Sequence, residues 1–588
     1  MPHVDKMSMK AFWEAVERRL AACSTDELRA ILRAMAQETP PAARQAFLGK
    51  LQPLPGTDAA IQQAVQQEDL LADIDDLARE LKEQTQQAEG WGEYGWGEYD
   101  DEDSLGPYEE FVEPLAALFD RAEAAFDFGD LALARRAYQK LFEALTLEDD
   151  YGRGVRADDL SDVDIDEARA RYLRAVYETG RPAHHPPALF EQMRQTQSWL
   201  AGRRPMLDNI IQITPHPLPD QNRFLRDWID YLRKQSGGDA DAWLREAVRL
   251  AQGTSGLEEL ARAEGKKRPR AYLDWLAALE EEGRHREVLL AAQEALQTLP
   301  AKLPIRAAIA DHLCAAAARL NETETLRAGR WEAFIAKPML ARLLDLWDAA
   351  PSHDERAGLM GQAAGHVKDY LAHPPRSQAM LEAERHWDDL ESPGWIDKSV
   401  LAHAYLLAGQ WQEAQQLAAR ENVLGWSGSD NPQGLVMPFF LVRLAGKSPT
   451  ALPGNLAQLW RQRLEASIGF GSWSGNEEDS LLKRLERAYA ERLSDASLSR
   501  DQQQPLLSWC IDVAKRRVEA IVGHQRRGSY DKAAVLTAAC AETLRLRGDD
   551  KAADALVDDI RNQFPRHRAF QAELDTALEH MKRSRRRR

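Results

Sequence analysis

Cysteine is scarce in this sequence of 588 residues, and long apolar runs are missing. The four cysteines, Cys23, Cys314, Cys510 and Cys540, lie far apart and lack the spacing of a zinc site or of a disulfide framework. No stretch approaches the ~20 apolar residues that a membrane helix needs, and the first residues contain no apolar signal core. These absences predict a chain that is not exported, does not enter a membrane and resides in the reducing cytoplasm.

Motifs that mark the common catalytic and cofactor sites are also missing. The sequence has no phosphate-binding loop ending in Gly-Lys-Ser or Gly-Lys-Thr, no dinucleotide fingerprint and no His-Glu-x-x-His pair. A serine at the centre of a nucleophile elbow is absent too. We therefore predict no catalytic residue, no cofactor and no bound metal. An enzyme whose pocket carries no known motif is the least favoured hypothesis.

Two short segments share some features of metal sites. The run 162–166 alternates aspartates as a calcium-binding loop does, but Glu167 and Leu173 replace the glycine and the glutamate that such a loop needs. His184 and His185 are adjacent in a proline-rich stretch and lack the cysteine or carboxylate spacing of a zinc site. We predict instead that the acidic run caps the next helix and that the histidines lie in a surface loop.

The negative charge is concentrated in one part of the chain. Residues 83–120 hold 12 acidic residues and no lysine or arginine, and residues 121–170 hold 13 acidic against 7 basic residues. These two stretches together account for the whole net charge of −18, so the rest of the chain is neutral in total. A neutral surface does not favour binding to a nucleic-acid duplex. The basic tail 582–588 alone suits nucleic acid, an acidic lipid surface or the chain's own acidic loops, and a solvated terminus is its simplest interpretation.

An acidic and aromatic segment occupies residues 84–107. Two copies of Gly-Trp-Gly-Glu-Tyr lead into four consecutive acidic residues. Glycine disfavours helix and the neighbouring charges repel one another, so we predict a flexible loop. Its candidate partner-binding residues are Trp91, Tyr94, Trp96, Tyr99, Asp100, Asp101, Glu102 and Asp103. They fit two hypotheses: aromatic anchors that enter a partner with a basic surface, or a plug that folds back on the chain's own helices.

The remainder of the chain is rich in Ala, Leu, Arg and Glu, which predicts helix nearly throughout. The stretch 118–145 shows the plan most clearly, because apolar residues recur three and four positions apart on both sides of Gly129. Gly129 suits the left-handed conformation that ends a helix, and Asp130 can cap the next one. One hairpin cannot bury its apolar face alone, so we predict an all-α fold of stacked helical hairpins.

The unit 272–300 carries a repeat pattern in its most complete form. The residues 5, 9, 12 and 17 positions after its turn glycine, Gly283, are Val288, Ala292, Ala295 and Pro300. Parts of the same pattern follow Gly129, Gly409, Gly528 and Gly548. These units resemble tetratricopeptide repeats, unevenly spaced and separated by long inserts. The resemblance implies a divergent α-solenoid whose surface binds a peptide or another protein.

Tryptophan is frequent, with 16 residues. Those at helical spacing are predicted to lie in the core, namely Trp13, Trp228, Trp243, Trp275, Trp347 and Trp460. Three more occur beside serine and glycine in loops, where we predict a structural role for Trp395, Trp426 and Trp473.

These patterns divide the chain into five segments. They are an N-terminal helical segment (1–83), the acidic and aromatic loop (84–107), a first helical-repeat region (108–330), a second helical-repeat region (331–581) and the basic tail (582–588). The leading hypothesis is a cytoplasmic, non-enzymatic scaffold or adaptor, bacterial by its composition, that binds a partner protein or peptide on its helical surface. The rival hypothesis is an acidic regulator that mimics nucleic acid and occupies the basic site of a DNA- or RNA-acting protein.

Overall fold

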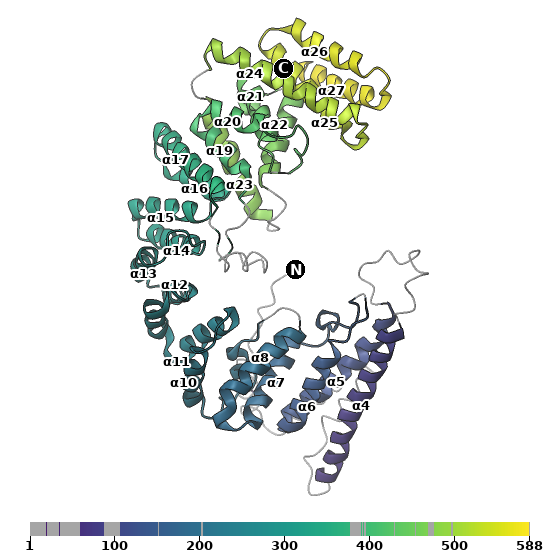
Figure 1. Cartoon of the computed structure of the whole chain (residues 1–588), viewed down its shortest axis with the longest axis vertical. Coiled ribbons are helices and arrows are strands. Elements are labelled where there is room, and N and C mark those ends of the chain that lie inside the picture. Colours follow the sequence, from purple (N-terminus) through teal and green to yellow (C-terminus); the bar gives the residue numbers. More distant parts are fainter. Residues whose placement is uncertain are drawn as a thin grey trace. The chain divides into compact units, whose positions relative to one another are not determined.

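The computed structural model is all-α over the part of the chain that it describes (Figure 1). No β-strand occurs among these residues, as the sequence predicted. The structure describes residues 19, 35, 59–87, 106–150, 152–200, 204–374, 376, 390, 392, 396–428, 430–452, 454–468, 475–494 and 498–586. It describes the backbone alone at residues 59–68, 87, 450, 475–480, 500 and 581–586.

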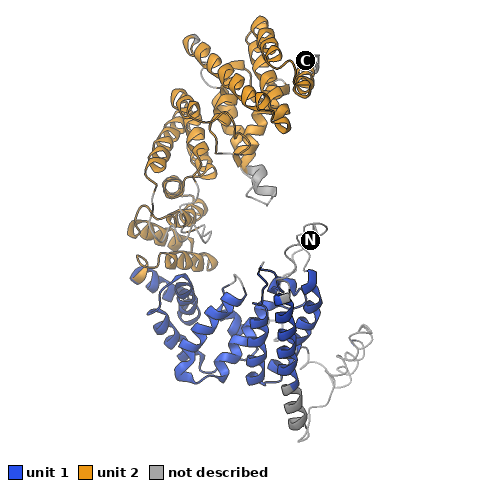
Figure 2. Ribbon diagram, turned by 45° about the vertical axis from the view of Figure 1, so that its right-hand side comes forward, with its two compact units in different colours: residues 1–263 blue, residues 264–588 orange. Residues whose placement is uncertain are grey.

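The chain divides into two compact units, residues 1–263 and 264–588 (Figure 2). The α-helices of the first unit are α4 (Ala59–Gln87), α5 (Val112–Asp127), α6 (Leu131–Ala144), α7 (Ile165–Thr179), α8 (His185–Trp199), α9 (Leu207–Gln212), α10 (Gln221–Leu232) and α11 (Gly238–Glu264). The short helical turns between them are η3 (Gly106–Phe111), η4 (Ala157–Asp159) and η5 (Pro182–His184). The long helix α11 bends at Gly253, where the backbone leaves the helical conformation.

The second unit contains the remaining helices. They are α12 (Arg270–Glu281), α13 (His285–Thr298), α14 (Arg306–Arg319), α15 (Thr323–Ala336), α16 (Leu340–Ala349), α17 (His353–Ala372), α19 (Lys398–Ala408), α20 (Trp411–Ala419), α21 (Gln433–Ala445), α22 (Gly454–Ile468), α23 (Gly475–Ser494), α24 (Arg500–Val518), α25 (Tyr530–Leu546), α26 (Asp550–Gln563) and α27 (Arg568–Arg586). Short turns occur at η6 (Pro449–Ala451), η7 (Glu519–Gly523) and η8 (Arg527–Ser529). The predicted boundary between residues 330 and 331 falls within α15, and the division into repeat regions stays a prediction.

Four of the five predicted turn glycines take the left-handed conformation at the end of a helix. The angle φ is +82° at Gly129, +71° at Gly283, +79° at Gly409 and +85° at Gly548. A residue with a Cβ atom is strained at such an angle, so glycine lets the chain reverse between two helices. After the first of these turns Asp130 caps α6 by accepting a hydrogen bond from the backbone N–H of Leu133 at 3.1 Å. Gly528 is the exception, since it lies within η8 and keeps a negative φ.

Helices that follow one another in the sequence pack against each other, and α14 with α15 form the most extensive pair. The sequence pattern did not predict this pair, because its turn uses Asn321 in place of glycine, at a φ of +59°. Asparagine tolerates this conformation better than most residues. The two helices approach closely at Gly329, where an added Cβ atom would lie 2.8 Å from the Sγ atom of Cys314.

Replacing Gly409 by alanine is expected to lower the free energy of unfolding by about 2 kcal/mol. The φ of +79° strains any side chain, and the new Cβ atom would lie 1.8 Å from an Nη atom of Arg492, which would have to move. Gly358 offers the matched control, because it is exposed on α17 and an added Cβ atom there meets nothing within 4 Å. Gly358→Ala should raise stability by up to about 1 kcal/mol. Urea unfolding of both variants tests the difference in sign.

Aromatic rings join the helices of the first unit. Phe142 of α6 lies 5.7 Å from Phe119 of α5 and 5.8 Å from Tyr172 of α7, measured between ring centroids. Because such contacts add to the burial of apolar area, they tie α5, α6 and α7 into one layer, and Figure 1 shows these helices side by side.

In the second unit α21 is the central helix, buried on almost every side. Its Phe439 contacts the rings of Trp411, Trp460 and Tyr489 at centroid distances of 5.5, 6.1 and 5.7 Å. The predicted core tryptophans that the structure describes are all buried, namely Trp228, Trp243, Trp275, Trp347 and Trp460. Trp13, Trp395 and Trp473 lie outside the described residues. Among the described helices, none is both long and apolar enough to cross a membrane.

Candidate functional site

The predicted partner-binding residues lie outside the described part of the chain. They are Trp91, Tyr94, Trp96, Tyr99, Asp100, Asp101, Glu102 and Asp103. Their role, as a plug or as anchors for a partner, therefore stays a prediction. The described part of the acidic stretch contains a second group of charged side chains, on α5 and α7.

We call this group the acidic cluster; its members are Glu123, Asp127, Glu167 and Arg171. Glu123 and Asp127 are one turn apart on α5, and Glu167 lies in the first turn of α7. Arg171, one turn further along α7, pairs through Nη2 with Glu123 Oε1 at 2.7 Å and with Glu167 Oε2 at 3.3 Å. Glu123 and Glu167 thus share a single guanidinium, whose charge also acts on Asp127, and the negative charge of the cluster is only partly compensated.

Partial desolvation changes the electrostatics of these carboxylates, although Asp127 is exposed and the side chain of Glu123 is 42% exposed. Desolvation raises the pKa of Glu123 and of Asp127, and the positive charge of Arg171 opposes that rise. For Glu123 the neighbouring charges of Asp127 and Glu167 raise the pKa further. Each carboxylate would hold its charge more easily beside a second cation. The cluster is therefore suited to receive a lysine or arginine from another molecule.

Two aromatic residues adjoin the acidic cluster, the buried Tyr138 and the exposed Phe128. Behind the cluster Tyr138 of α6 is completely buried, and burial raises the pKa of its phenol far above the usual value. Phe128 directly follows Asp127 at the end of α5, and it is 75% exposed, more than any other large apolar residue in the described part of the chain. An exposed aromatic ring next to partly compensated acids offers both an apolar and an anionic contact to a basic peptide.

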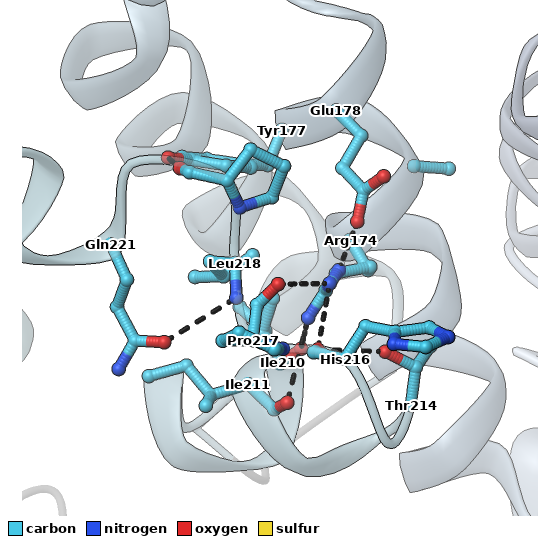
Figure 3. Close-up of polar contacts among 12 residues, drawn as sticks. Arg174, Tyr177, Glu178, Ile210, Ile211, Thr214, His216, Pro217, Leu218 and Gln221 are labelled. Atoms are coloured by element: carbon cyan, nitrogen blue, oxygen red, sulfur yellow. Dashed lines mark hydrogen bonds and ion pairs between the residues drawn. The ribbon is translucent and has the colours of Figure 1, made fainter.

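Helix α7 is held in place by Arg174, which is 2% exposed (Figure 3). Its guanidinium donates hydrogen bonds to the carbonyl oxygens of Ile210 and Ile211 at 3.4 Å and of His216 and Pro217 at 3.0 Å. It also pairs with Glu178 one turn further along the helix. One side chain thus joins α7 to the end of α9 and to the loop that follows it, and this contact fixes the helix that carries Glu167 and Arg171.

The segments that resembled metal sites have structural roles. Asp164 caps α7 by accepting a hydrogen bond from the N–H of Glu167 at 3.0 Å, as predicted for the acidic run. His184 is exposed in the turn η5, and the ring of His185 lies 4.1 Å from that of Tyr177. Within the described part of the chain, no three histidine, cysteine or acidic residues are grouped so that they could hold a metal ion.

A groove of about 640 Å³ lies in the second unit, between the ends of α21, α23 and α24. Its described lining residues are Val442, Arg443, Leu444, Gly446, Lys447, Ser448, Ala490, Leu493, Ser494, Leu498 and Gln503. Among these described residues are two cations, Arg443 and Lys447, and no histidine, cysteine or carboxylate.

Sequence reasoning missed the acidic cluster because its partners are distant in the chain. Glu123 and Arg171 are 48 positions apart, and no local pattern relates them. The one local signal was the pair Glu167 and Arg171, since residues four apart on a helix face the same side. The burial of three arginines on α7, namely Arg169, Arg171 and Arg174, had no sequence signal, because arginine is seldom buried.

No protein-family model matches the chain, and no curated protein matches it either.

Proposed function

We propose that this chain is a scaffold of divergent tetratricopeptide-like hairpins that binds a partner protein or peptide through its helical surface. Two features support the repeat assignment: helices pack with their sequence neighbours, and four turn glycines adopt the left-handed conformation at the predicted positions. Repeated hairpins of this kind bury their apolar faces against each other and leave an extended surface for recognition.

The acidic cluster is the observation that carries the proposal. Its carboxylates outnumber their guanidinium, desolvation raises the pKa of two of them, and the exposed ring of Phe128 follows Asp127 directly. A lysine or arginine beside an apolar residue in the partner would supply the missing charge and cover the ring. We therefore propose a partner with a basic segment.

The experiment compares partner capture by two variants of the full-length chain. Glu123→Gln combined with Asp127→Asn removes two charges from the acidic cluster, while Arg171 keeps its pair with Glu167. Proteins captured from a lysate of the native host are identified and then measured against purified chain. We expect at least a tenfold loss of affinity, about 1.4 kcal/mol, and weaker binding at higher salt.

The matched control is Glu109→Gln combined with Glu110→Gln. Both residues are exposed in η3 and belong to the same acidic stretch, so this variant changes the net charge equally. It should bind the partner nearly as well as the wild type. A further variant without residues 88–105, which leaves α4 and η3 complete, separates the contribution of the acidic and aromatic loop. A partner that remains bound to the cluster variant and to the loop deletion alike would refute the proposal.

A further inference from the structure

The loop between α20 and α21 has a defined shape because Asn431 ties it together. The side-chain nitrogen of Asn431 donates hydrogen bonds to the carbonyl oxygens of Asn422 and Leu424, both at 2.8 Å. Trp426 follows Leu424 closely and is only 3% exposed, which confirms its predicted structural role. The segment 423–427 therefore presents a fixed surface to the helices around it.

Two arginines from separate helices meet at this segment. Arg463 of α22 donates a hydrogen bond through Nη1 to the carbonyl oxygen of Trp426, and Arg517 of α24 donates through Nη1 to that of Val423. The guanidinium carbon of Arg517 lies 4.1 Å from the centroid of the Trp426 ring, as in a cation–π contact. Two positive charges thus meet at Trp426, one over its indole ring and one at its carbonyl oxygen.

No carboxylate compensates these two charges within the described residues. Burial lowers the pKa of Arg463, and burial together with the charge of Arg463 lowers the pKa of Arg517 to about 10. No described aspartate or glutamate contributes to either pKa. Arg517 is only 6% exposed, and a buried charge without a counter-charge is costly. The two guanidinium charges of Arg463 and Arg517 therefore lack a negative partner among the described residues.

Two buried hydrogen-bond donors at the same place have no partner. They are the indole Nε1 of Trp426 and the Nε of Arg463. The Oε1 atom of Gln433, in the first turn of α21, is a buried acceptor without a partner. It can accept two hydrogen bonds, but it is neutral and cannot balance two guanidinium charges. The donors and charges together call for an anion that accepts several hydrogen bonds.

The start of α21 adds to the positive potential. A Cβ atom placed on Gly434, in the first turn, would lie 3.1 Å from Cγ of Trp426 and 3.5 Å from Nη1 of Arg463, so the helix begins beside both groups. The dipole of a helix gives its N-terminus a partial positive charge, and this first turn contains no acidic residue, although its Gln433 N–H already donates to Oδ1 of Asn431 at 3.0 Å. Next to Trp426 in the chain, Oγ of Ser427 lies 3.4 Å from Nζ of Lys532, and both residues are exposed.

We propose that Arg463, Arg517 and Trp426 form a binding site for a small oxyanion of the phosphate class, beside the exposed Ser427. The two guanidinium charges match the charge of about −1.5 to −2 that a phosphate group carries at pH 7. Guanidinium groups suit its oxygens because their N–H groups form a planar fork. Anchoring the loop would require only neutral donors, so the anchoring role does not account for the paired charges.

The test measures the thermal unfolding midpoint of the full-length chain in inorganic phosphate and in chloride at equal ionic strength. A ligand at about a hundred times its dissociation constant should raise the midpoint by roughly 5 °C. The rise should saturate with phosphate concentration, and it should be lost in Arg463→Gln. Titration calorimetry of the wild type with inorganic phosphate gives a second measurement of binding, which does not require that any variant folds.

Arg461→Gln is the matched control, because Arg461 is exposed on the same helix and pairs with Glu465. It should keep the saturable rise, whereas a general salting effect of phosphate would appear in every variant alike. Acetate provides a further comparison: a rise in phosphate alone assigns the site to phosphate groups, and an equal rise in acetate assigns it to carboxylates. A rise that persists in Arg463→Gln, or no heat of binding in the wild type, would overturn the proposal.

Discussion

Replacing Glu542 by alanine is expected to lower the free energy of unfolding of the second unit by about 4 kcal/mol. The carboxylate of Glu542 in α25 accepts hydrogen bonds at 3.2 and 2.7 Å from the backbone N–H groups of Asn455 and Leu456, at the start of α22. It also accepts one at 2.8 Å from the side chain of Asn455, which in turn donates to the carbonyl oxygen of Ala577 in α27. Alanine would leave two buried backbone N–H groups without this acceptor and would remove one of the two hydrogen bonds of the Asn455 amide.

Asp549→Ala is the matched control for this prediction. Asp549 is also a carboxylate at a helix N-terminus in the same unit, where it accepts from the N–H of Ala552 at 3.0 Å, but it is exposed. Water can replace an exposed cap, so its loss should cost only about 1 kcal/mol. Urea unfolding followed by circular dichroism measures both variants. If both variants lose the same free energy of unfolding, the burial of Glu542 does not determine how much it contributes to stability.

The pH dependence gives this prediction a second readout. Burial raises the pKa of Glu542 above its ordinary value of 4.5, although the N–H groups of Asn455 and Leu456 oppose the shift. The folded state therefore keeps the proton to a higher pH than the unfolded state does. The contribution of this group to stability is complete below pH 4.5 and is lost as the pH rises through the folded value. The stability advantage of the wild type over Glu542→Gln should therefore shrink as the pH rises above that point.

The parts of the fold that the sequence predicted are those with local signals. Gly129 and Asp130 are adjacent, and the conformation of the first and the capping bond of the second follow from their own chemistry. The same holds for Asp164, which caps the helix that begins at the next residue. Asn321 takes the place of glycine in a turn of the same kind, so a search for glycine alone could not find it.

The candidate sites depend on contacts between distant residues, and for that reason the sequence could not reveal them. Arg171 finds Glu123 only when α7 packs on α5. Arg463 and Arg517 belong to different helices, and only the folded loop at Trp426 brings them together. Arginine is usually exposed, so sequence alone gives no reason to expect either pair in a partly buried place.

The first unit provides the other large effect, because Arg174→Ala is expected to lower its free energy of unfolding by about 4 kcal/mol. The substitution leaves the four carbonyl oxygens of the α9 end and the following loop without their donor, and it leaves Glu178 without its cation. Arg174→Lys should recover only part of the loss, since one ammonium cannot reach groups that a planar guanidinium spans.

Arg121→Ala separates this effect from the general loss of an arginine. Arg121 pairs with Asp73 at 2.6 Å in the same unit, but both side chains are about half exposed, so the change should cost less than about 1 kcal/mol. Proteinase K provides a local measurement: in Arg174→Ala the loop 213–220 should be cleaved faster, because two of its carbonyl oxygens, those of His216 and Pro217, lose their hydrogen bonds. If Arg174→Ala is destabilised while this loop stays as resistant to cleavage as in the wild type, Arg174 does not hold the loop in the way we propose. The position of the acidic cluster on α7 depends on the same contact.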